Sequence, residues 1–222
     1  MRRIFFVPPA PEGGLTSWQY RSLAITTQAL FRTAVPYAAA VAVPARVRHL
    51  AKRVHEIDLA VDRWVDRVRG PELDPVFYGL SSAADHGLVW LAIGALAAAR
   101  DGDPGVALRL GASLGVESAL TNGPIKLCFR RVRPVLDEPD APLPYGMHRP
   151  VTSSFPSGHA ASAFTAAVLL AGGPLTPVYV VLASGIAFSR VYVRMHHLSD
   201  IVAGAGLGTV LGLVARRVLP LR

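Results

Sequence analysis

The sequence is poor in charged residues and in cysteine, and both shortages limit what it can be. Only 17% of its 222 residues are charged, whereas an average soluble domain has about 25%. The mean hydropathy is +0.37, which favours a membrane protein. The single cysteine, Cys128, excludes an internal disulfide and a cysteine-based metal cluster. We therefore expect packing alone to hold the fold together.

Acidic residues are scarce relative to basic ones. The chain has 15 Asp and Glu against 23 Lys and Arg, which gives a net charge of +8. Such an excess is typical of proteins that bind nucleic acid, anionic lipid head groups or a phosphorylated substrate. Nucleic acid is disfavoured, because apolar runs separate the basic residues and no nucleic-acid-binding motif accompanies them. The expected partners are a membrane and a phosphorylated ligand, with no nucleic acid.

Long apolar runs predict membrane helices, which need about 20 mostly apolar residues each. Residues 22–44 are a possible sixth helix, weakened by Arg32 and Pro36. The expected fold is all-α, an integral membrane helical bundle of five to six transmembrane helices. The core would cover 56–222, after an N-terminal extension over 1–55. The five clear candidates cover residues 84–99, 105–124, 158–171, 175–189 and 199–216.

Two further patterns concern packing and orientation. Valine and isoleucine recur at helical spacing between residues 54 and 68, which predicts an amphipathic interfacial helix over about 56–78. Gly204, Gly208 and Gly212 share one helix stripe, which favours close helix packing within the chain or between subunits. The C-terminal "ARRVLPLR" predicts a cytoplasmic C-terminus in the inner membrane, with loops 125–157 and 190–198 on the outer face. The basic stretch 46–53 conflicts with this if 22–44 spans.

Three polar islands fall on that one expected face: "KLCFRRVRP" (126–134), "PSGH" (156–159) and "SRVYVRMHHLSD" (189–200). Arginine side chains match phosphate oxygens in pairs, and a helix N-terminus favours negative charge. Gly158 would let the backbone approach an oxyanion closely. Together the islands indicate a phosphate cradle.

The histidines indicate chemistry at this cradle. His196 and Asp200 are four residues apart, so on a helix the carboxylate can fix the imidazole's tautomer. An imidazole so oriented can attack phosphorus, while His159 from another helix protonates the leaving oxygen. His197 points about 100° away from His196 on a helix and is interpreted as a bystander.

The spacing of these residues resembles the three-part signature of the type 2 phosphatidic acid phosphatase superfamily, which includes the vanadium haloperoxidases. The resemblance implies a haloperoxidase-like helical core, no cofactor and no metal. It also implies His196 as the nucleophile, Asp200 as its orienting carboxylate and His159 as the acid and then the base. The phosphate-binding residues it implies are Lys126, Arg133, Ser157, Gly158 and Arg190.

The expected function is hydrolysis of a lipid phosphate or lipid pyrophosphate through a phosphohistidine. Phosphatidic acid, phosphatidylglycerol phosphate, polyprenyl pyrophosphate and polyprenyl-linked sugar phosphates all fit this cradle. A lipid phosphotransferase and a non-catalytic lipid-phosphate binder remain alternatives, and the oligomeric state is open.

Several polar residues stay without a firm role. Arg130, Arg131 and Arg149 are interpreted as head-group contacts. Glu117 and Arg109 lie within an expected span, where internal hydrogen bonding is slightly favoured over a substrate role. Asp85 and His86 could either tune the site or cap a helix.

Overall fold

The computed structural model describes residues 44–134, 147, 150 and 152–219, and its regular structure there is helical. The chain divides into two units, 1–49 and 50–222. Residues 44–49 are the described part of the first unit, and the helical bundle belongs to the second. The possible helix over 22–44 lies outside the described residues but for its last position, as does most of the loop 135–152. The helices are α2 (Ala45–Val68), α3 (Asp74–Ala83), α4 (Leu88–Asp101), α5 (Pro104–Leu120), α6 (Gly158–Leu170), α7 (Thr176–Tyr192) and α8 (Leu198–Val218).

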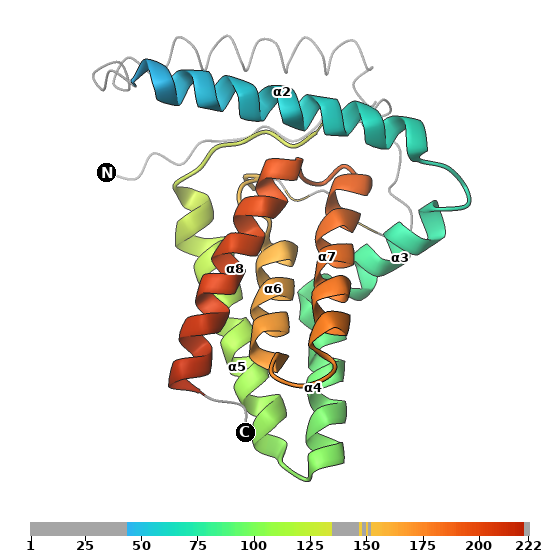
Figure 1. Ribbon diagram of the computed structural model, residues 1–222, viewed down its shortest axis with the longest axis vertical. Helices are drawn as coiled ribbons and strands as arrows, with labels where there is room; N and C mark the ends of the chain where they lie inside the picture. The colour runs from blue at the N-terminus through green and yellow to red at the C-terminus, as the bar shows by residue number, and fades with distance from the viewer. Residues whose placement is uncertain (1–43, 135–146, 148–149, 151, 220–222) are drawn as a thin grey trace, which may run out of the picture. The chain divides into compact units, whose positions relative to one another are not determined.

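The bundle is built around α6, which packs against α5, α7 and α8, while α4 packs against α5 (Figure 1). Helix α6 can be central because its buried residues are mostly alanine, whose small side chain lets neighbouring helices approach. Each of the five helices expected as spans is present, and their ends differ from the expected ones by up to four residues. The all-helical bundle expected from the sequence is confirmed.

The described helices differ in their capacity to cross a membrane. Helix α8 has 21 residues and is apolar enough to do so alone, since a helix of that length extends about 31 Å. Helices α3 and α4 count as one further span if they are taken together across a bend of 59°. Helix α6 is apolar but has only 13 residues.

The glycine stripe of α8 packs inside the chain against α6. A Cβ atom at Gly208 would lie 2.1 Å from the carbonyl oxygen of Ala161. At Gly204 it would lie 2.4 Å from the carbonyl oxygen of Ser157, and at Gly212 it would lie 2.9 Å from Cβ of Val168. The stripe therefore serves contact between helices of one chain, with backbone directly against backbone.

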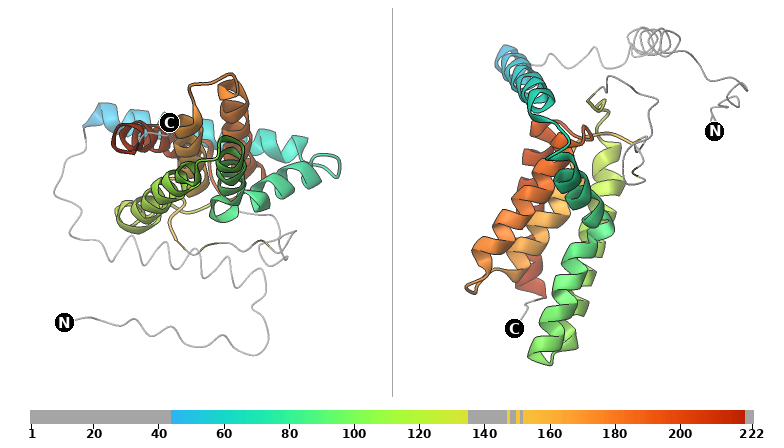
Figure 2. Two further views of the ribbon diagram at one scale, coloured as in Figure 1. Left: turned by 90° about the horizontal axis from the view of Figure 1, so that it is seen from below. Right: turned by 90° about the vertical axis from the view of Figure 1, so that its right-hand side faces the viewer.

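The interfacial helix expected over 56–78 is instead two helices. Helix α2 ends at Val68, and Gly70 and Pro71 separate it from α3, because neither residue continues a helix well. The part of α2 from Leu50 onward, which belongs to the second unit, lies across the end of the bundle where α6 and α8 begin and α7 ends, as Figures 1 and 2 both show. Ile57 of α2 is exposed, whereas the half-exposed Trp64 lies beside Phe188 of α7, with ring centroids 6.1 Å apart.

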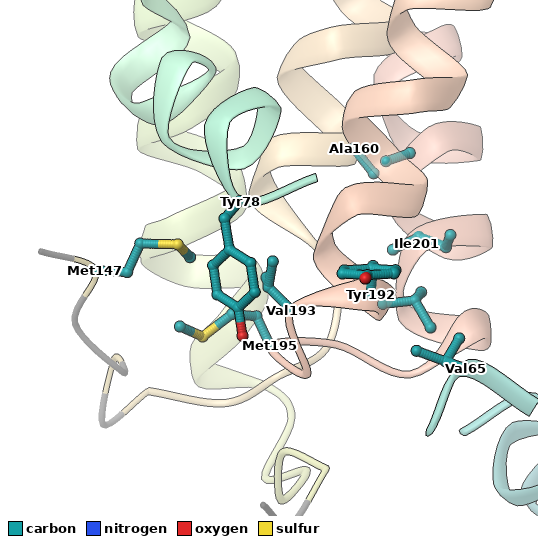
Figure 3. Packing of buried hydrophobic residues seen from close by; sticks show 10 residues of the cluster. Val65, Tyr78, Met147, Ala160, Tyr192, Val193, Met195 and Ile201 are labelled. Carbon is teal, nitrogen blue, oxygen red and sulfur yellow. The ribbon is translucent and has the colours of Figure 1, made fainter. Parts of the chain in front are cut away.

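The inner side of α2 meets the bundle through a small core. Val65 is fully buried there together with Tyr192, Val193 and Met195, and Figure 3 shows these side chains. Phe77 of α3 stacks on Tyr192 with ring centroids 4.4 Å apart. This core holds the segment that follows α7, on which His196 lies.

Candidate active site

The expected site residues meet at one end of the bundle, beneath α2. Lys126, Arg133, Gly158, Arg190 and His196 all line one cavity of about 740 Å³, and so does His159. They come from α6, α7 and two connecting segments that are far apart in the chain. The structure therefore brings six of the eight expected site residues to one cavity, whereas Ser157 and Asp200 are fully buried and do not line it.

The start of α6 supplies a polar backbone surface to this cavity. Ser157 is the N-cap of α6, and its hydroxyl oxygen accepts from the amide of Ala160 at 3.5 Å. Gly158 lies so close to Asn122 that a Cβ atom would come within 2.8 Å of that side-chain oxygen. A methyl group here would displace the Asn122 side chain, which also accepts from Lys126. Because the helix N-terminus carries partial positive charge, this edge favours an anion.

Three cations surround the same cavity. Arg190 of α7 is buried, donates to the hydroxyl of Ser81, and has an Nε with no hydrogen-bond partner among the described residues. Arg133 donates to the carbonyl oxygen of Met195 at 2.7 Å, and Lys126 donates to Asn122 at 2.9 Å. Burial lowers the pKa of Lys126 to about 8, and the positive charges of Arg133 and Arg190 act in the same direction. An anion bound between them would relieve this repulsion.

His196 is held with its two ring nitrogens in different surroundings. Its Nδ1 lies 3.6 Å from Oδ2 of Asp200, within ion-pair distance, and its Nε2 lies 3.4 Å from a guanidinium nitrogen of Arg133. Burial lowers the pKa of His196 to about 3, and the neighbouring arginines act in the same direction against the opposing effect of Asp200. The imidazole is therefore neutral at physiological pH, and one of its ring nitrogens carries a lone pair, as a nucleophile requires.

The turn between α7 and α8 gives His196 this position. Arg194 has a φ of +59°, in the left-handed region that non-glycine residues seldom adopt. The turn is closed by hydrogen bonds from the amides of Met195 and His196 to the carbonyl oxygen of Arg190. Asp200 lies in the first turn of α8 and accepts from the amide of His197 at 2.9 Å.

His159 is paired with a carboxylate from the other side of the cavity. Its Nε2 lies 2.7 Å from Oδ1 of Asp85. Asp85 begins a short 3-10 turn between α3 and α4, in which His86 and Gly87 have φ of +55° and +73°. These left-handed residues bend the chain so that Asp85 faces α6. Of the two roles left open for Asp85, the structure favours contact with the site.

Sequence reasoning missed an acidic stripe on α2. Asp58, Asp62 and Asp66 follow one another at four-residue spacing, and the first two are buried. Arg131 contacts Asp58 at 2.5 Å, and Arg194 contacts both Asp62 and Asp66. The spacing of the aspartates was the signal in the sequence that could have identified this stripe.

The basic and histidine residues beside the cradle have contacts of their own, and one assignment changes. Arg131 is not a head-group contact, because its guanidinium joins Asp58 to Asp200. Arg130 is exposed, and Arg149 lies outside the described residues. His197, interpreted as a bystander, does not line the cavity and contacts Asp62 at 2.9 Å.

The ionisable residues of α5 have partners within the chain, although Nε of Arg109 is buried with no hydrogen-bond partner among the described residues. Glu117 is buried and accepts from the hydroxyls of Thr121, at 2.8 Å, and Ser162. Arg109 pairs with Asp103 at 2.7 Å near the start of the helix. Internal hydrogen bonding, the interpretation favoured from the sequence, accounts for both residues.

The part of the cavity farther from the cations has an apolar wall. Between α4 and α5 its wall is apolar and small-sided, with Leu91, Leu114 and Gly115, whereas Ser118 and Asn122 lie between this part and the cradle. Among the described residues no three His, Cys, Asp or Glu side chains are grouped so that they could hold a metal ion. The cradle thus offers cations and backbone amides on one side and an apolar channel on the other.

The sequence and the fold match known proteins of one family. The profile of the PAP2 superfamily matches residues 106–222. A decaprenylphosphoryl-5-phosphoribose phosphatase of Mycobacterium tuberculosis is 33% identical over 143 residues, which cover 63% of this chain and 77% of that protein. The chain belongs to the PAP2 superfamily.

Solved structures agree in fold. The transmembrane PAP2-type phosphatidylglycerolphosphate phosphatase of Bacillus subtilis has a TM-score of 0.60 and 24% identity, over 87% of this chain and 94% of that one. LpxE of Aquifex aeolicus has a TM-score of 0.58 and 26% identity, over 72% of this chain and 94% of that one. The bundle is therefore an integral membrane fold, and the protein is a phosphatase of the PAP2 kind.

Proposed function

We propose that this phosphatase removes the terminal phosphate from a polyprenyl-linked sugar phosphate in the membrane, through a phosphohistidine at His196. The observation that carries the proposal is the asymmetric setting of His196. Its Nδ1 faces Asp200, and its Nε2 lies near Arg133 at a cavity lined by further cations. Nε2 is therefore the nitrogen that can attack a phosphorus atom held in the cradle.

In the first step Nε2 of His196 donates its lone pair to phosphorus, and the bond from phosphorus to the leaving oxygen breaks. His159 gives its proton to that oxygen, so the lipid product leaves as an alcohol. Asp85, 2.7 Å from His159, orients that imidazole and offsets its positive charge before transfer. Lys126, Arg133 and Arg190 stabilise the charge on the phosphoryl oxygens, which is the main requirement of phosphoryl transfer.

In the second step water attacks the phosphohistidine. His159, now neutral, takes a proton from that water, the bond between phosphorus and Nε2 breaks, and inorganic phosphate is released. His196 returns to its neutral form with Asp200 beside Nδ1. The cycle balances without a metal ion, because fixed cations already neutralise the phosphoryl group.

Two observations favour a polyprenyl-linked sugar phosphate over the other lipids. The curated relative from M. tuberculosis is named for a decaprenylphosphoryl sugar phosphate. In addition, Asp85, Ser118 and Asn122 line the cavity beside the cradle, where they could hydrogen-bond sugar hydroxyls, and the apolar wall near Leu91 and Gly115 could receive a hydrocarbon chain.

The arginines at the end of α8 favour one orientation of the protein in the membrane. Helix α8 runs from the site, at Leu198, to Arg216 and Arg217 in its last turn. The positive-inside rule would place those arginines in the cytoplasm of an inner membrane, with the site on the outer face. A substrate could then reach the cradle at head-group level with its chain still in the bilayer.

Phosphate release by purified protein in detergent micelles tests the proposal. The substrates are a polyprenyl phosphosugar phosphate, phosphatidic acid, phosphatidylglycerol phosphate and a polyprenyl pyrophosphate, each assayed with and without chelator. We expect the sugar phosphate to have the highest kcat/KM and the chelator to have no effect. His196→Ala should lose turnover, and His55→Ala, at an exposed position of α2, should keep it.

Three outcomes would contradict the proposal. Turnover by purified His196→Ala would exclude this nucleophile, and loss of activity in chelator would exclude metal-free catalysis. Transfer of phosphate to an added alcohol in preference to water would indicate a phosphotransferase. Acid-labile and base-stable labelling of the protein by substrate carrying radioactive phosphate, absent in His196→Ala, would support the covalent step.

A further inference from the structure

We propose that Arg131 is a positioning residue for catalysis, which fixes the carboxylate of Asp200 against His196 and is itself held by Asp58 of α2. This inference rests on the proposed function of His196. It gives α2 a part in the reaction although no residue of α2 lines the cavity.

The two carboxylate oxygens of Asp200 have different partners. Its Oδ1 contacts Arg131 at 2.5 Å, whereas its Oδ2 faces Nδ1 of His196 at 3.6 Å and accepts from the amide of His197 at 2.9 Å. Asp200 is fully buried. With one oxygen fixed by a guanidinium, the carboxylate cannot rotate, so the other oxygen stays directed at the imidazole.

Arg131 is itself anchored to α2. Its other terminal nitrogen contacts Asp58, also fully buried, at 2.5 Å. Asp58 in turn accepts from the amide and the hydroxyl of Ser199 at 2.8 and 2.7 Å. A planar guanidinium can bridge two carboxylates with two of its nitrogens, but an ammonium group is a single point of charge.

The positive charge of Arg131 also matters for the two aspartates. Arg131 contacts two buried carboxylates at once, and its positive charge offsets the negative charge of both. An ionised Asp200 stabilises the positive charge that develops on His196 when Nε2 bonds to phosphorus. Arg131 therefore favours the transition state without touching the phosphate, because it does not line the cavity.

The test compares Arg131→Lys with Arg130→Lys, a matched change at the neighbouring, exposed arginine. Arg131→Lys should lower kcat by about 10²-fold, the loss typical of a reacting group misplaced by about 1 Å. KM and the inhibition constant for inorganic phosphate should stay within twofold, because the cradle is intact. Arg130→Lys should match the unsubstituted protein.

Two further variants distinguish positioning from structural support. In an Asp200→Asn background, Arg131→Lys should cause no additional loss of kcat, because Arg131 acts through that carboxylate. Asp58→Asn should lower kcat in the same direction as Arg131→Lys, with KM unchanged. Thermal unfolding in detergent, read by circular dichroism, checks that each variant folds.

An additive loss in the Asp200→Asn background, or a kcat within twofold of the unsubstituted protein, would overturn the inference. So would parallel changes in KM and phosphate inhibition, which would indicate a disturbed cradle. Failure of the proposed function gives a different result, because His196→Ala would then retain turnover whatever the Arg131 variants do.

Discussion

Gly204 allows the most direct test of how helix packing sets the geometry of the cradle. It lies on α8 against the start of α6, and a Cβ atom placed there would be 2.4 Å from the carbonyl oxygen of Ser157. Ordinary contacts of a Cβ atom begin at 3.4 Å. In Gly204→Ala the two helices must therefore separate by about 1 Å at the N-cap of α6, a displacement that can cost about 10²-fold in rate.

The expected loss of stability follows from the same contact. Overpacking of a close interface costs about 1–3 kcal/mol, and Ala160 Cβ, at 3.1 Å from the added methyl group, offers no room on the other side. The amide of Ser157 also donates to the carbonyl oxygen of Asp200 at 3.1 Å, a bond that the separation would lengthen. Gly204→Ala should thus lose activity and stability together.

The assay is phosphate release and thermal unfolding of purified protein, with two companion variants. Gly206→Ala is the control, because nothing lies within 4 Å of its Cβ position. Gly208→Ala, whose Cβ would lie 2.1 Å from Ala161 and one turn further from the site, should lose stability with less effect on kcat. If Gly204→Ala had the kcat and unfolding temperature of Gly206→Ala, the packing argument would be wrong.

Three other changes test separate parts of the site. Burial lowers the pKa of Lys126 to about 8, so its positive charge is complete well below pH 8 and is lost above it. KM should therefore rise above pH 8 in a pH series of initial rates. Lys126→Arg should move that rise to higher pH. Asp85→Asn should reduce kcat more for an alkyl phosphate than for p-nitrophenyl phosphate, whose leaving group needs no proton; equal losses would separate Asp85 from the acid step at His159. Glu117→Leu leaves the hydroxyls of Thr121 and Ser162 without their acceptor. The free energy of unfolding, measured by denaturant titration, should fall by about 1–3 kcal/mol. An unchanged KM would show that the phosphate site itself is intact.

The helices and the residues of the phosphate cradle could be predicted from the sequence because each depends on a local pattern. Apolar runs located α4 to α8, and the spacing of Lys126 to Arg133 and of His196 to Asp200 identified the motifs. The place of Gly158 at the start of a helix is also a local feature. The Asn122 side chain, which a Cβ atom at this position would displace, comes from another segment.

Contacts between distant segments could not be predicted in this way. Arg130 and Arg131 look alike in the sequence, and only the approach of Asp58 and Asp200 distinguishes them. The buried side of α2 carries aspartates, whereas helical periodicity identifies a buried face by its apolar residues. The role of Asp85 depends on its contact with His159, which is 74 positions away in the sequence.

The position of Cys128 makes the site accessible to measurement in the unaltered protein. Cys128 is exposed, with its Sγ 3.3 Å from the carbonyl oxygen of Pro124, on the segment that joins Lys126 to Arg131. Because the sequence has no other cysteine, a thiol-reactive fluorophore or spin label attaches at this one place. The chain therefore carries a natural attachment point from which movement of the cradle on phosphate binding can be followed spectroscopically.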